Sequence, residues 1–248
     1  MTGNYDDLIY NLAVANRILG NEGVVDSFGH VSVRHPENPE RFLLSRSRAP
    51  NLVSREDILE FGPDGQPVKD NGPAPYNERF IHAAIFNARP DVQCVIHSHA
   101  EPLLPFGITD TKMQPVFHMG ARIGDDIPLW DIRDKFGDTN LLVVNMEQGE
   151  DLAAALGGNR MVLMRGHGNA VASSTLESTV MIAYYAMVNA RVQTMSMMMA
   201  LAQGKGMQSI VPLSPGEIEA ATRSGEKGTI GITRSWDGLA GRADLSGI

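Results

Sequence analysis

A short apolar run that ends in two histidines is the feature that most constrains the fold of this chain. The segment VQCVIHSH covers residues 92–99 and follows Pro90 closely. A run of this length fits a buried β-strand, which needs neighbouring strands to satisfy its backbone hydrogen bonds. The preceding segment, residues 76–90, has helical periodicity and should end before Pro90, because proline disfavours helical backbone in the residue before it. A helix that leads into a buried strand predicts a mixed α/β domain.

Other strands and helices follow one another without a linker, a repeat or a low-complexity segment. Short apolar or alternating runs predict strands at residues 30–34, 41–45, 140–145 and 160–164. Helical patterns lie at residues 8–19, 149–158, about 215–222, and 174 to about 202, the last with a capping box of Ser174 and Glu177. No GxGxxG motif follows a strand, so we predict one α/β domain over residues 1–210 rather than a doubly wound fold. Residues 211–248 are polar and glycine-rich and predict a partly helical, poorly ordered tail.

Composition excludes several classes of protein. The net charge of the 248 residues is −8 and no cluster of Lys and Arg is present, which argues against a nucleic-acid partner. Cys94 is the single cysteine, so no internal disulfide can form, in agreement with a reducing cytoplasm. The first 19 residues predict an amphipathic helix rather than a signal peptide. The methionine-rich segment 178–203 contains Arg191 and several polar residues, which favours a helix in the core or a subunit interface over a membrane span.

His97 and His99 are candidate metal ligands. Residues i and i+2 of a strand point to the same face, so both imidazoles can reach one cation. His167 follows the strand at 160–164 and lies between two glycines, which leave space beside a ligand. Three histidines at two strand ends would make an open, catalytic type of site. The alternatives are histidines with ordinary hydrogen bonds or exposure to solvent, and for His167 a glycine-rich turn.

A carboxylate ligand is available in Glu78, near the start of the helix that leads into the His-x-His strand. The alternative is a solvated glutamate that the helix dipole favours. His82 lies four residues further on, on the same helical face, and is an alternative ligand. We interpret His82 as structural, because the three other histidines already form a set.

These residues carry a resemblance. The segments FGHVSVR, NERFIHAAIFNARPDVQCVIHSHA and LMRGHGNAV resemble the class II aldolase/adducin family over residues 8–202. The resemblance implies that His97, His99 and His167 bind a divalent metal, and that Glu78 is the acid/base or an additional ligand. It also implies an α/β/α layered fold around a central, mainly antiparallel sheet, and a homotetramer with active sites at subunit contacts. The metal is left open among Zn, Mn, Fe and Co.

The chain departs from the sugar-phosphate aldolases of that family at their phosphate contacts. Those enzymes have Gly-Asn where this chain has Gly29-His30, and a T-P-[ST]-G turn where it has LSRSRAP (44–50). Tyr76 and Asn77 replace the small hydroxyl residues that usually precede the glutamate. A sugar-phosphate substrate is therefore not expected.

Arg46 and Arg48 stand where the phosphate turn is missing. Separated by one residue, they share a face in an extended segment, and each guanidinium group can bind a carboxylate through two hydrogen bonds. The alternative is a solvated basic loop. The region resembles a decarboxylase branch of the family that acts on hydroxylated aromatic or pyridine dicarboxylates, such as 3,4-dihydroxyphthalate or 3-hydroxy-2-methylpyridine-4,5-dicarboxylate.

The expected function is a metal-dependent, non-oxidative decarboxylase of such a substrate, because a divalent cation stabilises the negative charge that departing CO2 leaves behind. Aldol cleavage needs the same stabilisation, so an aldolase for a non-phosphorylated hydroxy acid or sugar acid is the alternative. A non-catalytic binding module, as in the adducin branch, is disfavoured by the intact ligand set.

Further roles are assigned to single residues. His30 is a candidate proton donor or contact for the substrate hydroxyl, and Ser45 and Ser47 are candidate substrate contacts. Tyr184 and Tyr185 lie on the late helix, where the family often places a residue that reaches the neighbour's site; Tyr184 is the candidate and burial in the core is the alternative. His118 is either structural or a support for a ligand.

Overall fold

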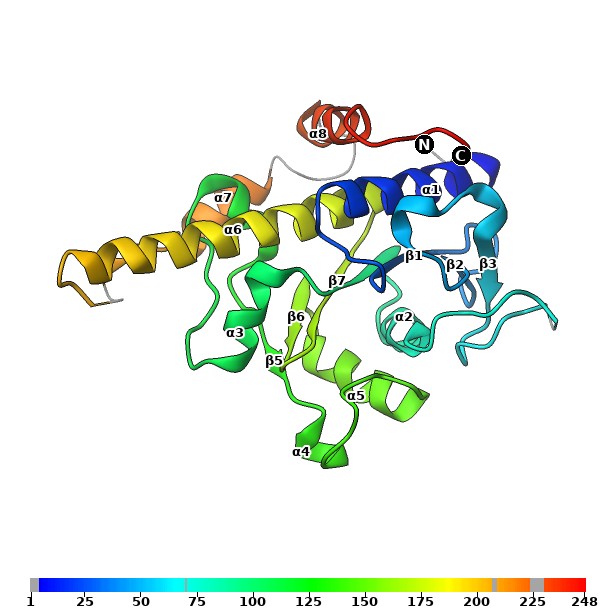
Figure 1. Cartoon of the computed structure of the whole chain (residues 1–248), viewed down its shortest axis with the longest axis horizontal. Coiled ribbons are helices and arrows are strands. Elements are labelled where there is room, and N and C mark those ends of the chain that lie inside the picture. The colour runs from blue at the N-terminus through cyan, green and yellow to red at the C-terminus, as the bar shows by residue number, and fades with distance from the viewer. Residues whose placement is uncertain (1–4, 70, 207–208, 224–229) are drawn as a thin grey trace.

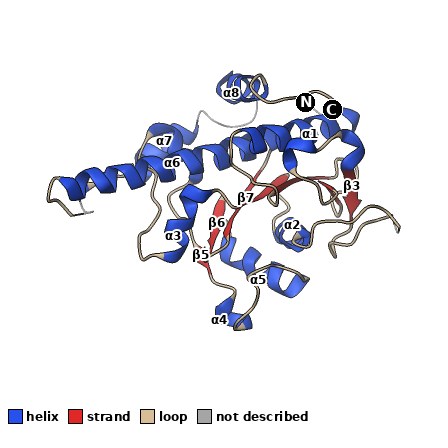
Figure 2. Cartoon of the chain, viewed as in Figure 1, coloured by secondary structure: helices blue, strands red, loops and turns tan. Residues whose placement is uncertain are grey.

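A seven-stranded sheet forms the centre of the molecule (Figure 2), in the order β3-β2-β1-β4-β7-β6-β5. We describe it from a computed structural model, which covers residues 5–69, 71–206, 209–223 and 230–248. The strands are β1 (His30–Arg34), β2 (Phe42–Ser45), β3 (Ile58–Phe61), β4 (Cys94–Ser98), β5 (Leu129–Trp130), β6 (Met161–Met164) and β7 (Gly168–Ser173). All neighbours pair antiparallel except β5 and β6. The mainly antiparallel sheet is thereby confirmed.

Helices cover both faces of the sheet (Figure 1), so the predicted α/β/α layering is also confirmed. They are α1 (Tyr5–Asn21), α2 (Arg79–Ala88), α3 (Leu104–Ile108), α4 (Arg133–Phe136), α5 (Met146–Leu156), α6 (Leu176–Ala202), α7 (Pro215–Arg223) and α8 (Ile230–Ala240). One layer contains α1, α6 and α8, and the other contains α2 and α5.

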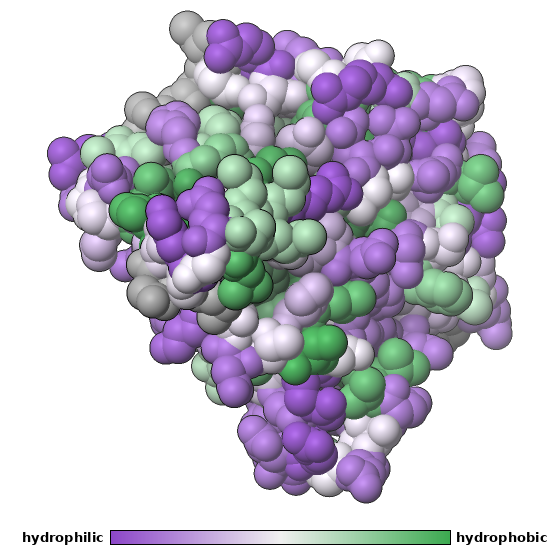
Figure 3. Space-filling view, turned by 60° about the vertical axis from the view of Figure 1, so that its left-hand side comes forward, coloured by the Kyte–Doolittle hydropathy of each residue, from purple (hydrophilic) through white to green (hydrophobic). Residues whose placement is uncertain are grey.

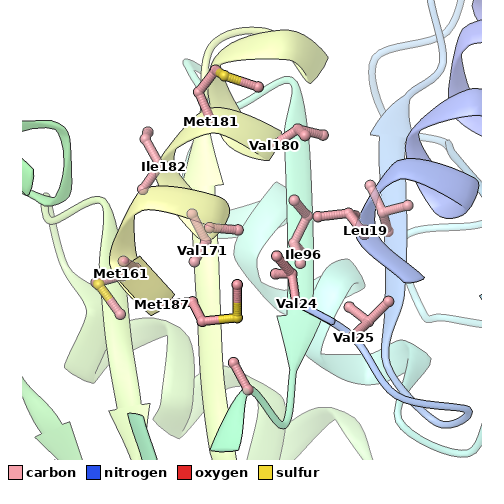
Figure 4. Close-up of a cluster of buried hydrophobic side chains, with 14 of the residues drawn as sticks. Leu19, Val24, Val25, Ile96, Met161, Val171, Val180, Met181, Ile182 and Met187 are labelled. Atoms are coloured by element: carbon pink, nitrogen blue, oxygen red, sulfur yellow. The ribbon is translucent and has the colours of Figure 1, made fainter. Parts of the chain in front are cut away.

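Strand alternation divides the side chains between two cores. Ile96 of β4 points into the core beneath α1 and α6, which Figure 4 shows with Leu19, Val171 and Met187 around it. Val95 points into the core beneath α2 and α5. His97 lies two residues after Val95 and therefore shares its face, so β4 presents His97 toward the layer of α2.

Two local predictions need correction, and two strands were missed. Residues 140–145 form no strand, because side chains bind two of their backbone N–H groups: Glu78 binds that of Val143 and Gln148 that of Val144. Thr175, rather than Ser174, caps α6, with its side chain accepting from the backbone N–H of Ser178. The strands β5 and β7 were not expected from the pattern.

The C-terminal half of α6 extends beyond the sheet (Figure 1) and carries exposed apolar side chains. Met195, Met198, Met199 and Leu201 are each more than 60% exposed, and Figure 3 shows apolar surface on this side of the molecule. None of the described helices is both long and apolar enough to cross a membrane. The tail after residue 210 contains α7 and α8, with residues 224–229 outside the described part. Arg17 of α1 donates hydrogen bonds to the carbonyls of Asp244 and Ser246.

Candidate metal centre

Four side chains converge where β4, α2 and the β6–β7 turn meet. Glu78 immediately precedes α2, His97 is in β4, His99 follows β4, and His167 lies in the turn between β6 and β7. Each offers a ligand atom, and these four atoms lie within 4.8 Å of one another. Metal–nitrogen bonds of about 2.1 Å place two ligands of one ion no more than about 4 Å apart, so the cluster is close to the size of a metal site.

Hydrogen bonds orient two of the imidazoles. Nδ1 of His97 lies 3.1 Å from the carbonyl oxygen of Asn169, and Nδ1 of His99 lies 3.1 Å from Oδ2 of Asp26. Both partners are acceptors, so each histidine carries its hydrogen on Nδ1 and a lone pair on Nε2. The two Nε2 atoms are 3.0 Å apart. Two lone pairs that face each other at this distance repel unless a cation lies between them.

His167 completes the donor set. Its ring nitrogens are buried and have no hydrogen-bond partner among the described residues, although Nε2 lies 3.5 Å from Oε2 of Glu78. A buried unpaired nitrogen is unfavourable by itself, and a metal bond would satisfy it. Gly168 permits the close approach of this segment to the end of β4, because a Cβ at this position would lie 2.2 Å from the carbonyl oxygen of Ser98. The donor set therefore fits a divalent cation.

Glu78 is buried, at 7% exposure, which excludes the solvated alternative. Its Oε1 accepts a hydrogen bond of 3.0 Å from the backbone N–H of Val143, and its Oε2 lies 3.5 Å from Nε2 of His97. Burial alone would raise the pKa of Glu78, but positive charge at His97 and His167 outweighs burial and holds the pKa well below its usual range; a cation bound at these nitrogens would favour the carboxylate in the same way. Glu78 is therefore a carboxylate, the form that binds a cation.

His30 lies beside the cluster without belonging to it. Its ring centroid is 5.2 Å from that of His97 and 4.4 Å from that of Tyr76. Burial lowers the pKa of His30, and neighbouring histidines lower it further. Burial likewise lowers the pKa of His82 to about 3. Both ring nitrogens of His82 are within hydrogen-bond distance of His30 and Ser32, so His82 is not a metal ligand.

Asp57 holds the two arginines. Nε of Arg46 donates to it at 2.6 Å, and Nη1 of Arg48 donates to both of its oxygens at 3.1 Å. The backbone of Arg48 is in turn bonded to the phenol oxygen of Tyr76, whose ring packs on His30. The arginine pair is thus linked to the metal centre through Tyr76 and His30. Part of each guanidinium group is already hydrogen-bonded to Asp57.

The other candidate site residues are more distant or differently placed. Ser45 is fully buried beside Tyr76, whereas Ser47 is exposed. Tyr184 packs against the core beneath α1 and α6, on the sheet face opposite to His97, so it does not line this chain's own centre. Tyr185 lies next to it with ring centroids 5.0 Å apart, and His118 is exposed at the start of a 3₁₀ helix.

Three supporting residues were not singled out in the sequence: Asp26, Asp57 and Asn169. Tyr76 was noted there only as a departure from the aldolases. Asp26 also accepts hydrogen bonds from the backbone N–H groups of Phe28 and Gly29. Asn169 follows His167 by two residues, and its side chain donates to the carbonyl of Ser98. The signal for Asn169 is its place in the RGHGN segment. Asp57 is distant from Arg46 in sequence and carries no local signal.

The fold and the donor set define a class of protein: an α/β/α domain with a His3Glu cluster suited to a divalent cation. Residues 10–194 match the model of the class II aldolase and adducin N-terminal domain, and the chain belongs to this family.

Similar proteins include two curated decarboxylases and a solved aldolase. Decarboxylase tropJ of Talaromyces stipitatus is 38% identical over 202 residues, which cover 76% of each chain. The 3,4-dihydroxyphthalate decarboxylase of Arthrobacter keyseri is 27% identical over 68% of this chain and 71% of its own. The structure of L-fuculose 1-phosphate aldolase from Glaciozyma antarctica superposes with a TM-score of 0.74 at 22% identity, over 95% of this chain and 89% of that one; this likeness concerns the fold.

Proposed function

We propose that this chain is a metal-dependent, non-oxidative decarboxylase of a hydroxylated aromatic or pyridine dicarboxylate. The convergence of Glu78, His97, His99 and His167 carries the proposal. Relatives that are named decarboxylases support the reaction type, and one of them is named for 3,4-dihydroxyphthalate. The metal would be Zn, Mn, Fe or Co, because imidazole and carboxylate ligands suit each of these.

The reaction exchanges a carboxylate for a proton. The bond from the ring carbon to the carboxylate breaks, CO2 leaves, and the ring carbon takes up one proton from water, which leaves one hydroxide ion. A bound divalent cation supplies Lewis acidity and orients the substrate. Glu78, kept ionised by its surroundings, serves as the fourth ligand in the resting site or accepts and passes on the proton. His30 lies close enough to contact the substrate hydroxyl.

Arg46 and Arg48 would bind the carboxylate that is retained. Together with Asp57 they carry a net charge of +1, so the group still attracts an anion after the internal ion pairs are counted. The Nη groups of Arg46 and the Nε and Nη2 groups of Arg48 have no hydrogen bond within the described part of the chain. These N–H groups are available for a planar carboxylate.

Assays of CO2 release test the proposal. Purified protein is loaded separately with Zn, Mn, Fe and Co and incubated with dihydroxyphthalates and hydroxypyridine dicarboxylates, in parallel with retro-aldol assays on hydroxy acids and sugar acids. We expect CO2 release from at least one dicarboxylate, and loss of this activity in His167→Ala. Aldehyde formation without CO2 release would replace the proposal by the aldolase alternative.

We also propose a homotetramer with active sites at the subunit contacts. The exposed methionines at the end of α6 favour association, because contiguous exposed apolar surface is uncommon on monomers. In such an assembly Tyr184 would act at the neighbour's site. Sedimentation velocity of the wild type and of Met198→Lys tests the assembly: a monomer in both samples contradicts it.

A further inference from the structure

A line of three buried polar side chains runs from the sheet into helix α2, next to the metal centre. Ser32 and His30 point from β1, and His82 comes from α2; each is no more than 1% exposed. Oγ of Ser32 lies 2.6 Å from Nδ1 of His82, and Nε2 of His82 lies 2.7 Å from Nδ1 of His30. None of the three is a metal ligand. Buried polar groups of this kind are stable only when every hydrogen has an acceptor.

The Ser32 hydroxyl decides the direction of these hydrogen bonds. Within the described residues its only hydrogen-bond partner is Nδ1 of His82. If Ser32 donates to His82, then His82 carries its hydrogen on Nε2 and donates it to Nδ1 of His30. In the reverse direction the hydroxyl hydrogen of Ser32 is buried without an acceptor, which is unfavourable by about 1–3 kcal/mol. The first direction is therefore favoured by about fivefold or more.

With Nδ1 accepting from His82, a neutral His30 carries its hydrogen on Nε2, at the other side of the ring. That ring packs against Tyr76 and against the ligand His97. We infer that Ser32 and His82 are positioning residues that hold His30 as the Nε2–H tautomer, so that His30 donates a hydrogen bond to an oxygen of the substrate beside the metal centre. The role of His30 toward the substrate rests on the proposed function. The assignment of its tautomer rests only on the hydrogen bonds of Ser32 and His82.

Nitrogen NMR of the intact protein tests the tautomer directly. Protein labelled with ¹⁵N-histidine and loaded with diamagnetic Zn is studied by long-range ¹H–¹⁵N correlation, and the His30 signals are identified by their loss in His30→Gln. We expect a protonated-type shift for Nε2 of His30 and an unprotonated-type shift for Nδ1. The opposite assignment in the wild type overturns the inference, whatever the activity assays show.

Two serine variants test whether Ser32 causes the preference of His30 for the Nε2–H tautomer. Ser32→Ala removes the terminal donor, and Ser173→Ala removes a hydroxyl at the far end of β7 as a matched control. In Ser32→Ala we expect a mixture of His30 tautomers and a fall in kcat for CO2 release of about twofold, because an equal mixture leaves about half of the molecules with the donating Nε2–H form. In Ser173→Ala both readouts should match the wild type.

A single Nε2–H tautomer in a folded Ser32→Ala protein, checked by circular dichroism, overturns the role of Ser32. Failure of the proposed function gives a different result: no dicarboxylate is decarboxylated by the wild type, while its His30 spectrum still shows the Nε2–H form.

Discussion

At the scale of single residues, hydrogen bonds fix the orientation and the tautomer of the candidate metal ligands. Asn169 and Asp26 place the hydrogens of His97 and His99 on Nδ1, and the backbone of Val143 orients Glu78. The convergence of the candidate ligands could be predicted in part from sequence, because strand alternation puts His97 and His99 on one face. Asp26 could not, because its contact with His99 spans 73 residues.

Asp26→Asn should weaken metal binding by about 10–100-fold. The amide can still accept from the backbone N–H groups of Phe28 and Gly29, so the local turn should persist. Its NH2 group, however, would donate to Nδ1 of His99 and move the histidine hydrogen to Nε2, where it blocks the metal. Competition titration with a chelator measures the affinity. Asp134→Asn, an exposed aspartate on α4, is the control; equal affinities in all three proteins contradict the prediction.

Arg46→Lys should raise KM for the dicarboxylate by about tenfold, the effect of losing roughly 1.4 kcal/mol of binding. Lysine keeps the charge but lacks the planar fork that binds a carboxylate through two hydrogen bonds. Metal content should be unchanged, because Arg46 contacts Asp57 and not the ligands. Arg133→Lys changes an exposed arginine that also pairs with an aspartate and serves as control. An unchanged KM in Arg46→Lys would exclude the carboxylate role.

The negative charge of Asp57 should stabilise the folded protein above about pH 4 and lose this effect at lower pH. Burial raises its pKa, but hydrogen bonds from Ser54, Arg46 and Arg48 outweigh burial and lower the pKa to about 2. A folded pKa below the unfolded value of about 3.9 gives stability that is present above pH 4 and is lost as pH falls toward 2. The difference in urea midpoint between wild type and Asp57→Asn should therefore shrink over this range. A difference independent of pH would show that the charge of Asp57 is irrelevant.

At the scale of elements, the packing of α5 on α2 holds Glu78 at the sheet. Gly149 of α5 faces α2 so closely that a Cβ there would lie 2.5 Å from the carbonyl oxygen of Phe80. Gly149→Ala should push the helices apart and lower the free energy of unfolding by about 1–3 kcal/mol. Metal affinity should fall as well, because Glu78 directly precedes α2. Gly158→Ala, whose Cβ would meet open space, is the matched control for both chemical unfolding and metal titration.

Periodicity predicted most of the strands and helices, but it could not predict where side chains replace backbone partners. The run NLLVVN has the composition of a strand, yet Glu78 and Gln148 take two of its backbone N–H groups. The strand β7 was missed because its segment, GNAVAS, begins with residues typical of a turn. The contact between Glu78 and Val143 spans 65 residues, so a local pattern cannot encode it.

At the scale of the whole molecule, a metal ion would join three segments that are far apart in the chain. Its ligands come from residue 78, from residues 97 and 99, and from residue 167, so the ion closes loops across both halves of the sheet. A ligand that binds only the folded state stabilises it by about 4 kcal/mol at a concentration 1,000 times its Kd. For a chain of this size that corresponds to a rise in Tm of roughly 10 °C.

Removal of metal should therefore lower the Tm of the wild type by roughly 10 °C, and addition of Zn to the stripped protein should restore it. His167→Ala should have a Tm that EDTA does not change, because it lacks one of the converging donors and the remaining three bind the ion weakly. His118→Ala removes an exposed histidine away from the cluster, so its Tm should respond to EDTA as the wild type does. A wild-type Tm that is insensitive to both EDTA and added Zn would mean that the four side chains do not act together as a metal site.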